Sequence, residues 1–117
     1  MPYYVSIIFN LSIFFVTPDV PGPVVDLKTT QVNKRIISLA WSDPLDNGGS
    51  DIMGYVVERK DAKMQLYRQP LETASCKCDI VGLLSGEEYK FRVVARNKYG
   101  LGAPVDLGPI LAADPLG

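Results

Sequence analysis

Short runs of alternating apolar and polar residues, separated by turn residues at regular spacing, fill the sequence from Thr17 onward. Alternation with a period of two is typical of strands that bury one face, and several such runs at even spacing favour two packed sheets. No segment of the sequence has a convincing helical period. We therefore predict an all-β fold, a seven-stranded sandwich. The predicted strands cover residues 24–30, 35–42, 53–60, 64–69, 75–81, 87–97 and 104–112.

The run from Glu87 to Asn97 specifies its own orientation. Apolar or small residues at positions 89, 91, 93 and 95 share one face, whereas the other face carries four cations, interrupted by Val94. A slip of one residue would bury the cations, so the register is strongly specified. The alternation within their own predicted strands likewise turns Trp41 and Tyr55 inward. We call the four cations the basic stripe: Lys90, Arg92, Arg96 and Lys98.

Composition excludes several functional classes. The 117 residues suffice for one domain, and 12 Lys+Arg against 13 Asp+Glu give a net charge of -1. Nucleic-acid binding requires a basic excess, so we predict no nucleic-acid partner. Histidine is absent, which removes the commonest general base and metal ligand. Glu87 and Glu88 are adjacent in a predicted strand and face opposite ways, so they cannot act together as a catalytic acid and base. We predict no enzyme, no catalytic residue and no cofactor.

The loop after Trp41 superficially resembles a calcium-binding loop. It carries oxygen-bearing side chains at five positions, but their spacing differs from that of an EF-hand and no glutamate closes the loop. Asn47-Gly48-Gly49 is better explained as a turn that needs positive φ angles. We therefore predict no metal site. The five residues are Asp43, Asp46, Asn47, Ser50 and Asp51.

The two cysteines, Cys76 and Cys78, lie on one face of a predicted strand. Neighbours of this kind do not easily reach disulfide geometry, and two thiols are too few for a zinc site. We expect both to stay reduced and to face inward, which suits a cytosolic protein.

Residues 1–18 form an apolar leader, and residues 19–117 form the expected domain. The leader is short for a transmembrane helix, which needs about 20 apolar residues, and it lacks the basic start and cleavage site of a signal peptide. Three origins stay open: translated non-coding sequence or an alternative start, a degenerate signal or anchor, or an extra strand, which its β-branched and aromatic content favours. We predict no membrane partner.

Five marker residues occur in the order and at about the spacing found in fibronectin type III domains. They are Leu27, Trp41, Tyr55, and Leu83 and Tyr89 within Leu83-x-x-Gly86-x-x-Tyr89. The region from about Pro18 to Asp114 therefore resembles such a domain. The resemblance implies a seven-stranded immunoglobulin-like sandwich of this type. It also implies a tyrosine corner, in which the Tyr89 hydroxyl bonds back to the chain near Leu83.

Three segments are similar to the intracellular repeats of titin, twitchin and the myosin-binding proteins, titin above all: residues 21–23, 43–50 and 97–104. One difference is Tyr67, where these repeats usually carry a second tryptophan. The resemblance implies a structural module of a muscle filament protein, cytoplasmic and sarcomeric. It would serve as a mechanical link between neighbouring domains and as a docking surface for myosin or other thick-filament components.

Two alternatives accompany this interpretation. The basic stripe is either the docking surface or a solvated sheet face paired with Glu58. The module itself could instead be an extracellular adhesion or receptor domain, because the fold is shared.

Overall fold

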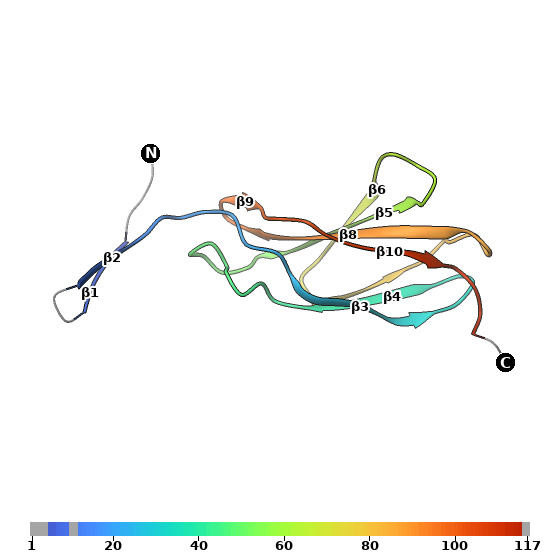
Figure 1. Ribbon diagram of the computed structural model, residues 1–117, viewed down its shortest axis with the longest axis horizontal. Coiled ribbons are helices and arrows are strands. Elements are labelled where there is room, and N and C mark those ends of the chain that lie inside the picture. The colour runs from blue at the N-terminus through green and yellow to red at the C-terminus, as the bar shows by residue number, and fades with distance from the viewer. Residues whose placement is uncertain (1–4, 10–11, 116–117) are drawn as a thin grey trace.

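The computed structural model describes residues 5–9 and 12–115, with side chains described for residues 17–115. Ten strands follow one another along the chain (Figure 1). Their bounds are β1 Val5–Phe9, β2 Ser12–Val16, β3 Val25–Val32, β4 Ile37–Ser42, β5 Gly54–Asp61, β6 Arg68–Thr73, β7 Lys77–Ile80, β8 Glu88–Asn97, β9 Gly100–Leu101 and β10 Val105–Leu111.

Eight of the strands form the predicted sandwich. One sheet has the order β10-β8-β5-β6, with β9 added beside β8, and the other has the order β3-β4-β7. All pairs are antiparallel. The all-β sandwich is confirmed, and the eighth strand is a minor difference. The extra strand is β9. Gly100, with a φ of 138°, closes a tight turn and pairs with Asn97 of β8.

One predicted strand is misplaced. Residues 64–69 were expected to be extended, but the strand begins at Arg68. Met64 and Leu66 lie in a loop and are 54% and 69% exposed, so their alternation is not that of a buried strand face. The loop starts with a turn in which the Asp61 carboxylate accepts the Lys63 amide at 3.0 Å. β6 contains Pro70, which is tolerated because β6 is an edge strand.

The leader contributes β1 and β2, which pair with each other from Val5↔Val16 to Phe9↔Ser12. This hairpin is a two-stranded sheet of its own, separate from both sheets of the sandwich. Residues 5–9 and 12–16 thus have strand conformation.

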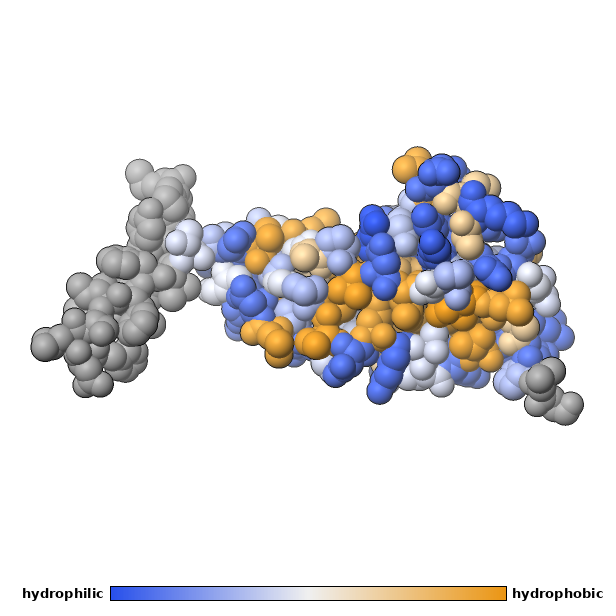
Figure 2. Space-filling model, viewed as in Figure 1, coloured by the Kyte–Doolittle hydropathy of each residue, from blue (hydrophilic) through white to orange (hydrophobic). Residues whose placement is uncertain are grey.

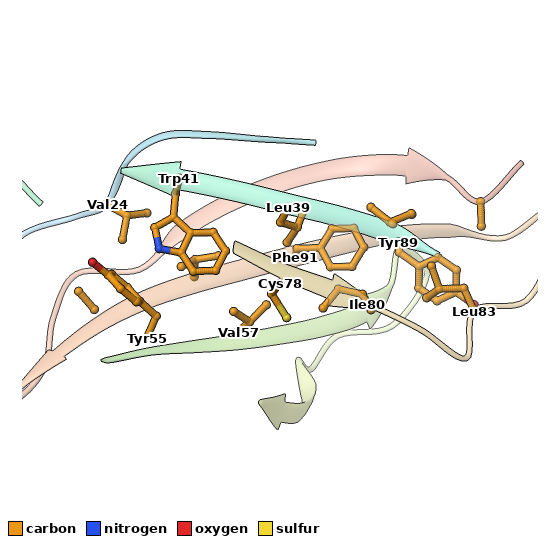
Figure 3. Packing of buried hydrophobic residues seen from close by; sticks show 14 residues of the cluster. Val24, Leu39, Trp41, Tyr55, Val57, Cys78, Ile80, Leu83, Tyr89 and Phe91 are labelled. Atoms are coloured by element: carbon orange, nitrogen blue, oxygen red, sulfur yellow. The ribbon is translucent and has the colours of Figure 1, made fainter. Parts of the chain in front are cut away.

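The core lies between the two sheets and consists of the inward faces set by strand alternation (Figure 3). Trp41 and Tyr55 meet at one end, with ring centroids 5.4 Å apart in an edge-to-face arrangement. Tyr89 and Leu83 lie at the other end, and Phe91 fills the middle with no exposed surface. Leu27 is half-buried against this cluster. The five marker residues therefore all belong to the core or its border.

The two ends of the sandwich are also the two ends of its chain. The segment before β3 arrives at one end of the long axis, and the segment after β10 leaves at the other (Figure 1). Among the described residues, no helix is long and apolar enough to cross a membrane.

Candidate functional site

Three cations of the basic stripe, Lys90, Arg92 and Arg96, lie on β8 on the outer face of the larger sheet, whereas Lys98 lies in the turn between β8 and β9 because the strand ends at Asn97. β8 is central in this sheet, so its residues from Glu88 to Arg96 have neighbours on β10, on β5 or on both. Arg92 lies between Asp106 of β10 and Glu58 of β5. One row further along, Lys90 lies directly opposite Lys60. The register thus adds a fifth cation to this face, which sequence reasoning missed.

The ion pairs of the stripe differ from the expected pairing with Glu58. Arg92 Nε lies 2.9 Å from Asp106, and Arg96 lies 3.5 Å from Glu72 of β6. Glu58 makes no ion pair among the described residues. The hydrogen bond that Arg92 donates to Asp106 raises the pKa of Arg92 above its ordinary value. Because the carboxylates are more than half exposed and the arginines about a third exposed, water screens each pair, which contributes only ~0.2–1 kcal/mol.

Tyr67 organises one end of this face. Its ring lies beneath two cations, with the Arg92 guanidinium carbon 4.2 Å and the Lys60 ammonium 4.9 Å from the ring centroid. Partial burial, followed by the proximity of Asp106, raises the pKa of its hydroxyl. The surrounding side chains enclose a hollow of about 270 Å³. The hollow is lined by Lys60, Gln65, Leu66, Tyr67, Lys90, Arg92, Asp106, Leu107 and Gly108.

The stripe is divided by a buried apolar pair. Val56 and Val94 are cross-strand neighbours on this outer face, yet they are only 9% and 6% exposed. Beyond them, Arg96 lies near the end of β8 and Lys98 lies in the turn that follows it. Lys98 contacts the ring of Tyr99 with its ammonium 5.2 Å from the centroid. The four cations therefore form two groups, and the hollow contains only Lys90 and Arg92 of the stripe.

The tyrosine corner is present at the start of β8. The Tyr89 hydroxyl oxygen accepts the backbone N–H of Leu84 at 2.9 Å. Gly86 adopts a φ of 87° in the turn between them, and its amide donates to Ala112 at 2.8 Å. The phenol thus joins the segment around Leu83 to β8, as the resemblance implied.

A polar cluster closes the other end of the core. The Tyr55 hydroxyl donates to the Asp43 carboxylate, and the Cys76 sulfur lies 3.3 Å from the same oxygen. These bonds lower the pKa of Asp43. Burial, followed by the bond to Asp43, raises the pKa of Tyr55. Both cysteines are free, Cys78 buried and Cys76 half-buried, and burial raises the pKa of each thiol. Raised values disfavour the reactive thiolate.

The acidic loop uses its oxygens within the turn itself. Asp46 accepts the Gly48 amide and Asn47 accepts the Gly49 amide, each at 2.8 Å, and both glycines have positive φ. Within the described part of the chain, no group of three or more Cys, Asp or Glu side chains could hold a metal ion.

The segment before β3 is fastened to two loops. We call residues 18–23 the N-terminal joint. The Asp19 backbone amide donates to the Gly48 carbonyl at 2.9 Å. The Asn97 side-chain amide donates to the backbone carbonyls of Asp19, at 2.9 Å, and Asn47, at 2.7 Å. Gly102 lies so close to Pro21 that a Cβ would overlap the proline carbonyl oxygen. Asn97 was not singled out from the sequence. It continues the inward-facing series of positions 89, 91, 93 and 95, and a polar residue in such a series is a signal that the sequence contains.

Comparisons with known proteins agree with this geometry. The family model for the fibronectin type III domain matches residues 21–106. Myosin-binding protein H of Gallus gallus is 39% identical over 82 residues, covering 69% of this chain and 15% of that protein. A titin homolog of Caenorhabditis elegans is 35% identical over 88 residues, covering 75% of this chain and a share of that protein that rounds to 0%.

Solved structures agree with the relatives. Domains A168–A170 of titin superpose with a TM-score of 0.77 at 27% identity, over 91% of this chain and 38% of theirs. The chain therefore spans a small part of the length of the relatives it matches. The family match, the tyrosine corner and the two-sheet topology lead to one conclusion: the chain belongs to the fibronectin type III family, with homologues among the modules of titin and the myosin-binding proteins.

Proposed function

We propose that the chain is a non-catalytic module of a muscle filament protein in the sarcomere, a mechanical link between neighbouring domains and a docking surface for thick-filament proteins. The observation that carries this proposal is the similarity to titin and myosin-binding protein modules. We take residues 19–117 as the module and residues 1–18 as a leader outside it.

The two ends of the sandwich support the linking role. The N-terminal joint is held by the bonds to Gly48 and Asn97, so a force applied there reaches the loops of both sheets. At the opposite end, Asp114 accepts the backbone amide of Lys34 at 3.1 Å and lies 3.9 Å from its ammonium. A pull between the termini therefore loads the sandwich along its long axis. Resistance to such a pull depends on the unfolding rate.

The basic stripe supports the docking role. Three of its cations lie on one sheet face and the fourth in the adjoining turn, whereas the chain as a whole has a net charge of -1. Contacts of this kind are electrostatic, so they are weak singly, sensitive to salt and strengthened by repetition along an array of domains. The name of myosin-binding protein H directs the choice of partner toward myosin.

Co-sedimentation of a tandem array of the module with myosin filaments, at low and at high salt, tests this proposal. Arg92 and Arg96 are poor positions for charge reversal, because reversal would also break their ion pairs. We therefore choose Lys90→Glu with Lys98→Glu. The matched control is Lys28→Glu with Lys77→Glu, which makes the same change of charge on the outer face of the smaller sheet, where both lysines flank Ala40.

We expect the stripe variant to lose binding at low salt while the control variant binds like the original chain. The melting temperature of each variant checks that the sandwich is intact. Equal binding by both variants would show that the stripe is a solvated face and not a docking surface.

A further inference from the structure

The hollow beside Tyr67 contains a concentration of positive charge that the fold does not neutralise. Lys60 and Lys90 are direct cross-strand neighbours, and like charges in this relation are destabilising. Within residues 17–115, neither ammonium belongs to an ion pair. Three cations line the hollow against one lining carboxylate, Asp106, and Glu58 lies beside it opposite Arg92, so positive charges still outnumber negative ones here. The local charge is thus opposite in sign to that of the whole chain.

Tyr67 holds two of these cations in place without consuming their hydrogen-bond donors. A cation above an aromatic ring is attracted to the ring face, and its N–H groups stay free to bind another acceptor. The Arg92 guanidinium has five N–H donors, and its Nε–H is engaged by Asp106. Its terminal amino groups and both lysine ammonium groups therefore remain available to an anionic ligand in the hollow.

We infer that this hollow binds an acidic segment of a protein partner, with one carboxylate between Lys60 and Lys90 and a neighbouring one at Arg92. The inference rests on the proposed docking function and narrows it to one part of the stripe. It adds Lys60 and Tyr67 to the surface and leaves out Arg96 and Lys98, which lie beyond the buried Val56–Val94 pair.

The lining of the hollow favours a peptide over a phosphate-rich ligand. Asp106 lines the hollow, and its charge repels a doubly charged phosphate more strongly than a single carboxylate. Leu66 is 69% exposed and offers an apolar contact that a peptide can use beside its carboxylates. Hydrophilic side chains gather around the loop between β5 and β6, which carries the exposed Leu66 (Figure 2).

A labelled synthetic peptide rich in glutamate and leucine tests the inference by fluorescence anisotropy at low salt. Its counterpart, with glutamine at every glutamate, removes the carboxylates and keeps the shape. The hollow variant is Lys60→Gln with Lys90→Gln, and the control variant is Lys28→Gln with Lys77→Gln. We expect the hollow variant to bind the peptide about tenfold more weakly, as the loss of two exposed charge pairs implies, and the control to bind unchanged.

Two results would overturn the inference: equal binding by the hollow and control variants, or equal binding of the glutamate and glutamine peptides. Displacement of the peptide by inorganic phosphate at constant ionic strength would also overturn it, because the hollow would then be a phosphate site. The myosin co-sedimentation separates the two proposals. Filament binding that survives Lys60→Gln with Lys90→Gln refutes the hollow alone, whereas peptide binding without filament binding refutes the muscle docking role alone.

Discussion

Replacing Tyr89 by phenylalanine isolates the contribution of the tyrosine corner. The change removes one oxygen and leaves the ring in the core, where Tyr89 is only 8% exposed. That oxygen accepts the Leu84 amide at 2.9 Å, a normal length for a neutral hydrogen bond. A net bond of this kind contributes about 0.5–1.5 kcal/mol, and a part-buried amide left without a partner adds to the loss. We therefore expect Tyr89→Phe to cost about 1–2 kcal/mol.

Urea denaturation followed by tryptophan fluorescence measures this loss, because Trp41 is the single tryptophan of the chain and lies in the core. A loss of this size moves the midpoint by about 1 M urea, since the slope for small domains is about 1–3 kcal/mol/M. The slope should not change, because the amount of surface buried on folding is the same.

Tyr99→Phe is the matched control for this measurement. Tyr99 is 38% exposed, and its hydroxyl makes no hydrogen bond in the described part of the chain. The control should stay within about 0.5 kcal/mol of the original chain, as surface substitutions generally do. If Tyr89→Phe were no more costly than Tyr99→Phe, the hydroxyl would not join the corner to β8 and the assignment of the corner would be refuted.

Three further substitutions test other parts of the sandwich. Trp41→Ala should cost about 3–5 kcal/mol in urea denaturation followed by circular dichroism, since the variant has no tryptophan, and a loss under about 1 kcal/mol would contradict its core position. Asp43→Asn should flatten the stability profile below about pH 4, because the folded-state pKa of Asp43 is lowered by Tyr55 and its contribution disappears as pH falls through that pKa; parallel profiles would exclude this role. Gly102→Ala should cost about 1–3 kcal/mol by overlapping the N-terminal joint, whereas Gly22→Ala, whose Cβ would make ordinary contacts, should be nearly neutral.

Much of the fold could be predicted because strand alternation is a local property. The side-chain period of a strand is two, so the apolar positions of β8 identify its inner face without reference to any other strand. Trp41, Tyr55 and Tyr89 could be assigned to the core for the same reason, and all three are buried. The turn at Gly48 and Gly49 was equally predictable, since positive φ is a property of the turn itself.

The misplaced strand shows where local pattern fails. Met64 and Leu66 alternate with polar residues as strand residues do. The alternation does not show that pairing between β5 and β6 begins only at Arg68. β6 instead begins at Arg68 and accepts Pro70, because an edge strand leaves one side of its backbone without a partner. Propensity and periodicity do not say which strand lies at an edge.

The sequence by itself determined which side chains of β8 face outward, and so it determined that Lys90, Arg92 and Arg96 share one outer face. Only the tertiary structure decided what the basic stripe contacts. The pairing of β8 with β5 and β10 places Lys60 opposite Lys90 and Asp106 beside Arg92. The loop before β6 brings Tyr67 against the same cations. Register between strands that are distant in the chain depends on how the whole core packs, so the hollow becomes visible only once both sheets are assembled.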